Sequence, residues 1–218
     1  MIKLINDDCM NVMKDYEDDH FDLAIVDPPY GIELDYFNRP NSKYKGSAAH
    51  NKKYHLPNTL NNIKPSKEYF EELFRVTKNQ IIWGGNYFVN YLKPKSCYVV
   101  WDKNKTWGNY ADCEMAWTSF NKPARIFKFT WKGMLQEDMK NKEERIHPTQ
   151  KPVALYKWLL HNYAKKGQKI LDTHLGSGSI GIACHYFGVD LVGVEIDKEY
   201  YKKSKERINL LTRQQTLF

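Results

Sequence analysis

The sequence predicts an α/β fold, in which a doubly wound, mostly parallel sheet carries helices on both faces. Short apolar runs alternate along the chain with segments of helical periodicity. Two of these runs end directly at an aspartate, Asp27 and Asp172. A third, Leu191–Val194, follows a glycine-rich turn and a helical segment, which is the order of a βαβ unit. At 218 residues, the whole chain (1–218) is expected to form a single domain.

The predicted strands are short apolar or alternating runs bounded by turn residues. In chain order they are Ile2–Ile5, Phe21–Val26, Gln80–Trp83, Cys97–Trp101, Glu114–Phe120, Arg125–Lys132, Lys169–Leu171 and Leu191–Val194. Phe21–Val26 is the clearest case, because the proline pair after it cannot continue a ladder. Arg125–Lys132 is predicted from alternation alone, with its aromatic residues on one face.

The predicted helices have apolar residues at helical spacing and a recognisable signal at one end. They begin after Cys9, at Ser66, at Pro152, at Ile180 and at Lys198. Ser66 suits an N-cap, and Pro152 suits a first helical position, where an N–H is not needed. Gly167 and Gly188 end the third and fourth helices. The polar stretch Met134–Arg145 is expected to be a loop.

Composition restricts the compartment and the class of protein. No apolar run approaches the roughly 18 residues of a membrane span, so a cytoplasmic protein without a membrane partner is expected. The four cysteines, Cys9, Cys97, Cys113 and Cys184, lack C-x-x-C spacing. They are predicted to be reduced thiols, and neither a disulfide framework nor a metal site is expected.

The net charge of +7 comes from a single stretch. Between Tyr36 and Lys67 there is no acidic residue and there are seven basic ones: Arg39, Lys43, Lys45, Lys52, Lys53, Lys64 and Lys67. A connection of this length and composition, about residues 33–65, predicts a flexible basic loop that clamps a polyanion. A solvated insertion without a partner is the alternative.

The tetrapeptide Asp27-Pro28-Pro29-Tyr30 lies at the carboxyl end of a predicted strand, where open α/β sheets hold their ligands. Asp27 offers a carboxylate that only accepts hydrogen bonds, and the prolines fix the direction of nearby carbonyls. Tyr30 offers an aromatic face. Together these groups suit a planar amine whose two hydrogens are accepted and whose ring is stacked. A proline-rich turn with a capping aspartate is the alternative.

A second motif lies near the C-terminus. The strand that ends at Asp172 is followed by Gly176-Ser177-Gly178-Ser179, a helix, and a strand that ends at Glu195. The glycines allow a ligand to approach the backbone, and Glu195 can accept both hydroxyls of a ribose. The unit predicts a nucleoside-containing ligand. NAD is one possibility, because Gly181 completes G-x-G-x-x-G, but NAD gives the Asp27 motif no role.

With both motifs in this order, the chain resembles the S-adenosylmethionine-dependent amino-methyltransferases of DNA, in their circularly permuted β group. These enzymes methylate N6 of adenine or N4 of cytosine. The resemblance covers nearly the whole chain. The matching segments are Asp8-Cys9, Asp27–Tyr30, His147–Pro152, Asp172–Ser179 and Val194–Asp197. It implies a Rossmann-like class I methyltransferase fold whose permutation brings the two termini together.

The resemblance also implies S-adenosylmethionine as cofactor and double-stranded DNA as substrate, with the target base flipped out of the duplex. Asp27, Pro28, Pro29 and Tyr30 are the catalytic residues that it implies. The implied cofactor-binding residues are Asp8, Cys9, Thr149, Gln150, Lys151, Asp172, His174, Gly176, Ser177, Gly178, Ser179, Glu195, Ile196 and Asp197. In this set Glu195 holds the ribose, Asp8 lies near the adenine, and Thr149 and Lys151 bind the carboxylate. Arg39, Lys43, Lys45, Lys52 and Lys53 are the expected DNA contacts.

The chain departs from the family pattern at three places. The usual Asp-Pro-Phe is replaced by Asp172-Thr173-His174, so His174 is expected either to stack or to act as a base. Asp7 stands where glycine is common. The segment available for reading a DNA sequence, about residues 106–145, is short.

The function predicted is site-specific methylation of the N6 amine of adenine in DNA. Within the family, aspartate at the position of Asp27 is commoner with adenine, and serine with cytosine. The alternatives are N4-cytosine methylation, methylation of RNA or of a protein amide, a non-catalytic DNA-binding subunit, and an NAD-dependent oxidoreductase. A homodimer and a cognate restriction enzyme are the further partners considered.

Overall fold

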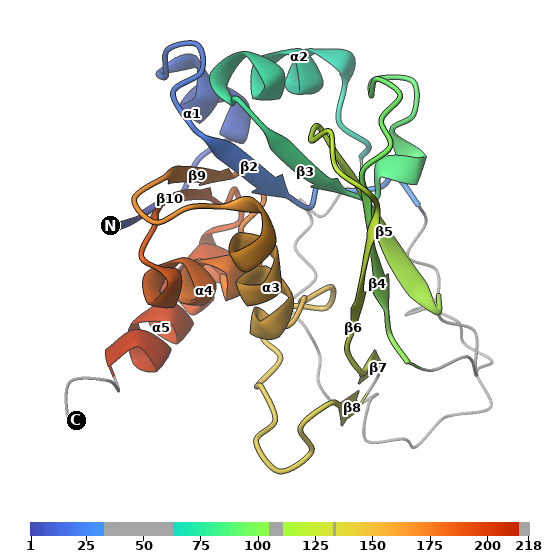
Figure 1. The fold of residues 1–218 in the computed structure, drawn as a ribbon. Coiled ribbons are helices and arrows are strands. Elements are labelled where there is room, and N and C mark those ends of the chain that lie inside the picture. The colour runs from blue at the N-terminus through green and yellow to red at the C-terminus, as the bar shows by residue number, and fades with distance from the viewer. Residues whose placement is uncertain (33–62, 105–110, 133, 214–218) are drawn as a thin grey trace.

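The structure is a computed structural model that describes residues 1–32, 63–104, 111–132 and 134–213 (Figure 1). Across these ranges an eight-stranded sheet has the order β1-β10-β9-β2-β3-β5-β4-β6. Its strands are β1 (Ile2–Ile5), β10 (Asp190–Val194), β9 (Lys169–Asp172), β2 (Leu23–Val26), β3 (Gln80–Trp83), β5 (Cys113–Thr118), β4 (Tyr98–Asp102) and β6 (Arg125–Lys128). The strands from β1 to β3 are mutually parallel, and β5 is antiparallel to both of its neighbours. The predicted mostly parallel α/β sheet is confirmed.

Helices cover both faces of the sheet (Figure 1). On one face lie α1 (Cys9–Lys14) and α2 (Lys67–Val76). On the other lie α3 (Val153–Tyr163), α4 (Ser179–Phe187) and α5 (Lys198–Arg213). The sheet is therefore the middle of three layers, as a doubly wound fold requires.

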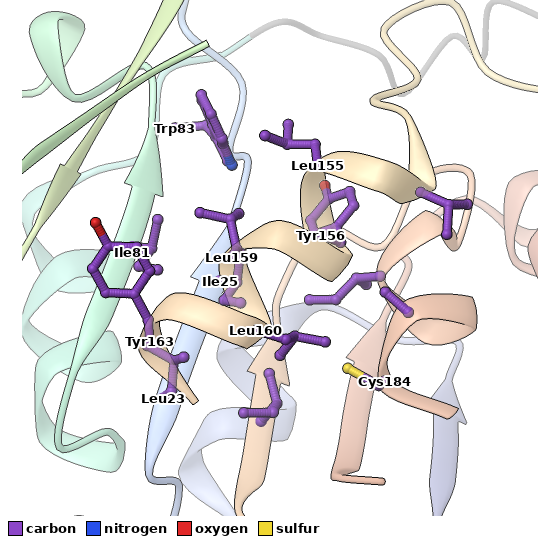
Figure 2. Close-up of a cluster of buried hydrophobic side chains, with 14 of the residues drawn as sticks. Leu23, Ile25, Ile81, Trp83, Leu155, Tyr156, Leu159, Leu160, Tyr163 and Cys184 are labelled. Atoms are coloured by element: carbon purple, nitrogen blue, oxygen red, sulfur yellow. The ribbon is translucent and has the colours of Figure 1, made fainter. Parts of the chain in front are cut away.

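Each face of the sheet has its own hydrophobic core, because successive side chains of a strand point to opposite faces. Leu23 and Ile25 of β2 pack with Leu155 and Leu159 of α3, as Figure 2 shows. Ala24 and Val26 belong to the second cluster, which contains α2 residues such as Leu73. Because β2 is buried on both faces, its sequence is a continuous apolar run instead of an alternation.

The connections diverge between β9 and β2. From β9 the chain runs through α4 to β10, and from β2 it runs through α2 to β3, on the opposite face and in the opposite direction. In open α/β sheets, ligands bind outside the carboxyl ends of the strands at such a switch point. The topology therefore directs attention to the residues that follow β9, β2 and their neighbours.

The first strand lies beside the last one, with Ile2 opposite Leu191. The C-terminal helix α5 also packs near this edge, since Tyr186 of α4 donates a hydrogen bond to the Leu211 carbonyl of α5. Both ends of the described chain lie on the same side of the molecule (Figure 1). That this order arose by circular permutation stays a prediction, as does the assignment of the whole chain to one domain.

The prediction of one strand over Arg125–Lys132 is wrong. The strand β6 stops at Lys128, and Trp131–Lys132 (β7) pairs instead with Leu135–Gln136 (β8) in a separate small sheet. The ladder breaks because the Thr130 N–H binds the Glu137 carboxylate and the buried Trp131 indole donates to the Gln150 carbonyl. The strand β8 also interrupts the loop predicted over Met134–Arg145.

Other elements differ from the predictions by a residue or two at their ends. Pro152 is the N-cap of α3 and not its first helical residue. The predicted strand Glu114–Phe120 is Cys113–Thr118, which forms part of the main sheet. The described part of segment 106–145 therefore includes β5 and β6 of the main sheet, and the role of the segment in reading DNA stays a prediction.

Candidate active site

The carboxyl ends of five neighbouring parallel strands carry most of the predicted site residues. In sheet order, β1 leads to Asp8, β10 to Glu195, β9 ends at Asp172, β2 leads to Asp27, and β3 leads to Gly84. Neighbouring strands are about 4.8 Å apart, so the Asp27 motif and Glu195 are separated by about 10 Å of sheet edge. The two motifs, which lie far apart in the sequence, are brought to one edge.

Asp27 follows β2 and has a partner at each carboxylate oxygen. The Tyr30 hydroxyl donates to Oδ1 at 2.6 Å, and the Lys151 ammonium pairs with Oδ2. The Tyr30 ring stacks on Tyr87, with ring centroids 5.0 Å apart and an interplanar angle of 14°. The Asp27 side chain is therefore held in one orientation.

Gly84 makes room for the Tyr30 ring. It has φ of +67°, and a Cβ at this position would lie 2.2 Å from the ring of Tyr30. Glycine is needed for both reasons.

The resemblance implies that Lys151 binds the cofactor carboxylate, and this role stays a prediction. Its side chain is 4% exposed, and its Nζ pairs with Asp27 and, at 3.1 Å, with Oε2 of Glu114. Glu114 also pairs through Oε1 with Lys103 at 2.6 Å. Burial lowers the pKa of Lys151, but the two carboxylates outweigh this effect and raise it. Glu114 and Lys103 were not found from the sequence, because no motif contains them.

The glycine-rich loop connects β9 to α4. Gly176 and Gly178 have φ of +52° and +71°, in the left-handed region that favours glycine. The loop is tied to its surroundings by a buried guanidinium: Arg207 of α5 donates to the Ser177 carbonyl and the Ser179 hydroxyl, both at 3.0 Å. The same guanidinium pairs with Glu143 at 2.8 Å. Arg207 lies in a charged helix whose sequence gave no signal of this role.

Glu195 lies just after β10, and each of its carboxylate oxygens accepts one hydrogen bond from the backbone. Oε2 accepts from the Gly176 N–H at 2.8 Å, and Oε1 accepts from the Asp197 N–H at 3.0 Å. Burial raises the pKa of Glu195. A carboxylate has about four acceptor positions, so Glu195 retains capacity for two more donors. Its neighbour Ile196 is exposed, and Asp197 caps α5 by accepting from the Tyr200 N–H.

Asp8 and Cys9 form the start of α1. Asp8 is the N-cap and accepts from the Met10 N–H at 2.8 Å. Burial, followed by the charge of Asp8, raises the pKa of the Cys9 thiol to about 12, so this thiol is protonated at neutral pH. Both residues lie at the end of β1, next to the strand that leads to Glu195.

Asp172 is buried and His174 is half-buried at the switch point. Burial raises the pKa of Asp172 to about 8, and the negative charges of Asp27 and Glu195 act in the same direction. His174 donates its backbone N–H to Asp172 at 3.0 Å, and its ring lies edge-on to Tyr69. Burial lowers the pKa of His174 to about 4, which leaves the imidazole neutral at pH 7.

The segment His147–Pro152, which directly precedes α3, also contributes to the site. His147 packs against Tyr200, and its ring would lie 3.7 Å from a Cβ at Gly176. The exposed Thr149 hydroxyl is 3.1 Å from Nδ1 of His147. Gln150 is buried and uses its amide for the backbone of Glu144 and Ile146. Gln150 therefore holds the loop, and its contact with a cofactor stays a prediction.

The five residues predicted to contact DNA lie outside the described residues. They are Arg39, Lys43, Lys45, Lys52 and Lys53. Their role stays a prediction based on the charge of the sequence.

The fold and the position of the site define the class: a Rossmann-like sheet of the class I methyltransferase type, with its ligand groups at the carboxyl edge. A family model described as DNA methylase, of the N6/N4 type, matches residues 41–206. The chain belongs to this family.

Two curated relatives are similar in sequence. Type II methyltransferase M.HpaI of Haemophilus parainfluenzae is 23% identical over 251 residues, covering 95% of this chain and 74% of that protein. Type II methyltransferase M2.LlaDCHI of Lactococcus lactis subsp. cremoris is 28% identical over 145 residues, covering 66% of this chain and 53% of that protein.

Three solved structures share the fold. M1.HpyAVI in complex with SAM has a TM-score of 0.60 at 21% identity, over 95% of this chain and all of that one. TTHA0409 of Thermus thermophilus, complexed with S-adenosyl-L-methionine, has a TM-score of 0.60 at 14% identity, over 98% and 97%. The cytosine-N4-specific PvuII DNA methyltransferase has a TM-score of 0.62 at 9% identity, over 98% and 92%.

Proposed function

We propose that this DNA methylase transfers a methyl group from S-adenosylmethionine to the N6 amine of adenine in DNA. The observation that carries the proposal is the shared sheet edge on which Asp27 and Glu195 lie, two strands apart. An acceptor for an amine and an acceptor for a ribose are thus within the reach of one cofactor and one base.

The residues present fit S-adenosylmethionine. Glu195 has acceptor capacity for the two ribose hydroxyls, and Asp8 lies one strand further along, toward the adenine end. The left-handed glycines Gly176 and Gly178 let the methionine part approach the backbone. The sulfonium of the bound cofactor supplies an electrophilic methyl group. M1.HpyAVI and TTHA0409, which share the fold, were both solved with this cofactor.

Asp27 and the Pro28 carbonyl accept the two hydrogens of the base amine. An exocyclic amine is a poor nucleophile because its lone pair is conjugated with the ring. Two acceptors in hydrogen-bonding position would favour the sp³ geometry that frees this lone pair. The nitrogen could then bond to the methyl carbon as the carbon–sulfur bond breaks, with S-adenosylhomocysteine leaving and the surplus amine proton passing to solvent. Tyr30 provides the aromatic surface for the flipped base. Positioning is therefore the main catalytic device, and no covalent intermediate with the protein is needed.

Adenine is preferred to cytosine because the first residue of the catalytic motif is Asp27, whereas cytosine enzymes of the family more often have serine there. N4-cytosine methylation is the second candidate. PvuII methyltransferase has this specificity, but at 9% identity the likeness concerns the fold alone.

The deciding experiment uses methyl-labelled S-adenosylmethionine and DNA of mixed sequence. After incubation the DNA is digested to nucleosides, and the labelled nucleoside is identified by mass. We expect N6-methyldeoxyadenosine. Label in N4-methyldeoxycytidine would select the second candidate, and parallel reactions with RNA and protein would reveal label there if the amine belongs to another substrate.

The partners of the enzyme and its location are predicted from the sequence alone. A homodimer, a cognate restriction enzyme and a cytoplasmic location stay predictions. Across the described ranges, no helix has both the length and the apolar character needed to cross a bilayer.

A further inference from the structure

We propose that Glu114 is a positioning residue for methyl transfer, which acts by holding Lys151 against the carboxylate of Asp27. The inference rests on the proposed function, because Asp27 is the amine acceptor there. It gives a role to a residue outside every motif of the sequence, and it assigns Lys151 to the methyl-accepting side of the site.

The contacts form a chain of alternating charge across four elements. Lys103, just after β4, pairs with Glu114 of β5 at 2.6 Å. Glu114 pairs with Lys151, before α3, at 3.1 Å, and Lys151 pairs with Asp27, after β2. The Lys151 ammonium also lies 5.3 Å from the ring centroid of Trp83. Glu114 and Lys151 therefore each have two charged partners. The residues at the two ends, Lys103 and Asp27, directly follow strands of the sheet.

Charge balance keeps Lys151 at this position. Burial would raise the pKa of Glu114, but Lys151 and Lys103 outweigh it and hold the pKa at about 2, so Glu114 is ionised at neutral pH. Moving the ammonium to a cofactor carboxylate would withdraw it from two carboxylates at once, and uncompensated buried charge is costly. Lys151 therefore acts as a fixed partner of Asp27.

A fixed Lys151 determines the direction of the Asp27 carboxylate. With Oδ2 held by the ammonium and Oδ1 by the Tyr30 hydroxyl, the carboxylate plane cannot rotate freely. The orientation of an acceptor matters when reacting atoms must be aligned, and a displacement of about 1 Å can cost about 100-fold in rate. Loss of Glu114 leaves Lys151 with one carboxylate instead of two and loosens this alignment.

The test compares Glu114→Gln and Lys151→Met with the wild-type protein. The kcat and KM for DNA methylation are measured together with the affinities for S-adenosylhomocysteine and for 5′-methylthioadenosine, which lacks the carboxylate. We expect kcat to fall between about tenfold and 100-fold in both variants. Both affinities should stay within about twofold of wild type, because Lys151 does not contact the cofactor. Glu71→Gln, which removes an exposed ion pair with Lys67, is the matched control and should leave kcat unchanged.

A second arm tests whether Lys151 acts through Asp27. In an Asp27→Asn background, where residual activity is measured by single turnover, Lys151→Met should cost nothing further. Additive losses in the double variant would overturn the proposal. So would a Lys151→Met protein that loses affinity for S-adenosylhomocysteine but not for 5′-methylthioadenosine, because that result makes Lys151 the carboxylate ligand.

An unchanged kcat in folded Glu114→Gln overturns the inference while the proposed function stands. A wild-type protein that methylates no substrate overturns the proposed function itself. If Glu114→Gln does not fold, Glu114→Asp keeps the charge and withdraws it from Lys151. A lower kcat at unchanged cofactor affinity in that variant supports the role, and an unchanged kcat refutes it.

Discussion

Asp27 is the residue on which the proposed chemistry depends, and its two oxygens are already engaged by Tyr30 and Lys151. The protein holds the carboxylate in place before a base arrives. Such preorganisation means that the orientation is not established anew in each reaction cycle.

Replacing Asp27 by alanine should abolish methyl transfer while leaving the cofactor affinity largely intact. The amine would lose one of its two acceptors, and we expect kcat to fall by at least about 100-fold. Label transfer to DNA and calorimetric binding of S-adenosylhomocysteine measure the two properties. Asp18→Ala, at an exposed carboxylate paired with Arg75, serves as control. An Asp27→Ala protein as active as wild type would refute the assignment.

Asp172 should make stability depend on pH. Its pKa is about 8 in the folded protein, against an ordinary value of 3.8, so the folded state keeps a proton that the unfolded chain releases. Stability therefore falls as pH rises from about 4 to about 8, and the contribution is constant above that range. The Asp172→Asn variant has no titrating group at this position. Its free energy of unfolding should therefore rise relative to that of the wild type as pH increases over the same interval.

Urea unfolding of both proteins at about pH 5, 6.5, 8 and 9 measures this difference. The same histidines are present in both proteins, so their titration cancels in the comparison. A difference in unfolding free energy that does not change with pH would show that Asp172 is ionised throughout.

Residues within short motifs could be predicted, and residues that act across the sheet could not. The sequence predicted the positions of Asp27, Gly176, Gly178 and Glu195 because each of them follows a recognisable apolar run or turn. Glu114 pairs with Lys151, which belongs to a different segment of the sequence, and the pairing of β5 with β3 and β4 brings Glu114 to the site. No local pattern contains that information.

At the scale of elements, the left-handed glycines divide into two kinds. Some have φ above zero with open space around them, as Gly188 does. Gly84 has φ of +67° and in addition lies against the Tyr30 ring. The two kinds of constraint have different consequences and can be separated by substitution.

Gly84→Ala should be more damaging than Gly188→Ala. Both place a Cβ at positive φ, which costs about 1 kcal/mol, but only the Gly84 variant must also displace an aromatic ring. We expect a further loss of about 1–3 kcal/mol in the free energy of unfolding, and a lower kcat because Tyr30 moves away from Asp27. Urea midpoints and methylation rates check both effects. Equal stability losses in the two variants would mean that the Tyr30 ring adjusts without cost.

The elements themselves were predictable where burial imposes a pattern. The strands β1, β2, β3, β9 and β10 and the helices around them follow from apolar runs, glycines and caps. The prediction of one strand over Arg125–Lys132 failed because alternating apolar and polar residues indicate a half-buried surface, but they do not indicate a continuous ladder of hydrogen bonds. The Glu137 carboxylate that takes the Thr130 N–H lies beyond the predicted strand, so the break had no signal within it.

At the scale of the molecule, the positive charge is concentrated in one stretch of sequence between β2 and α2. Deleting Asn41–His55 removes Lys43, Lys45, Lys52 and Lys53. DNA affinity should then fall, and the slope of log K against log salt should decrease by up to about 0.9 for each phosphate that the shortened chain no longer neutralises.

DNA binding measured between about 50 and 200 mM salt checks this prediction. A variant with the same four lysines changed to glutamine keeps the length of the segment and isolates the effect of charge. An unchanged slope in both variants would mean that this stretch does not touch the DNA backbone.

The pairing of β1 with β10 has a consequence for how the protein is made. Ile2–Ile5 leaves the ribosome well before Asp190–Val194, the strand with which it pairs. Until β10 has been made, Ile2–Ile5 has no neighbouring strand to pair with, and its apolar side chains lack their final packing partners. The carboxyl edge with Asp8 beside Glu195 is therefore completed only once Asp190–Val194 has been synthesised.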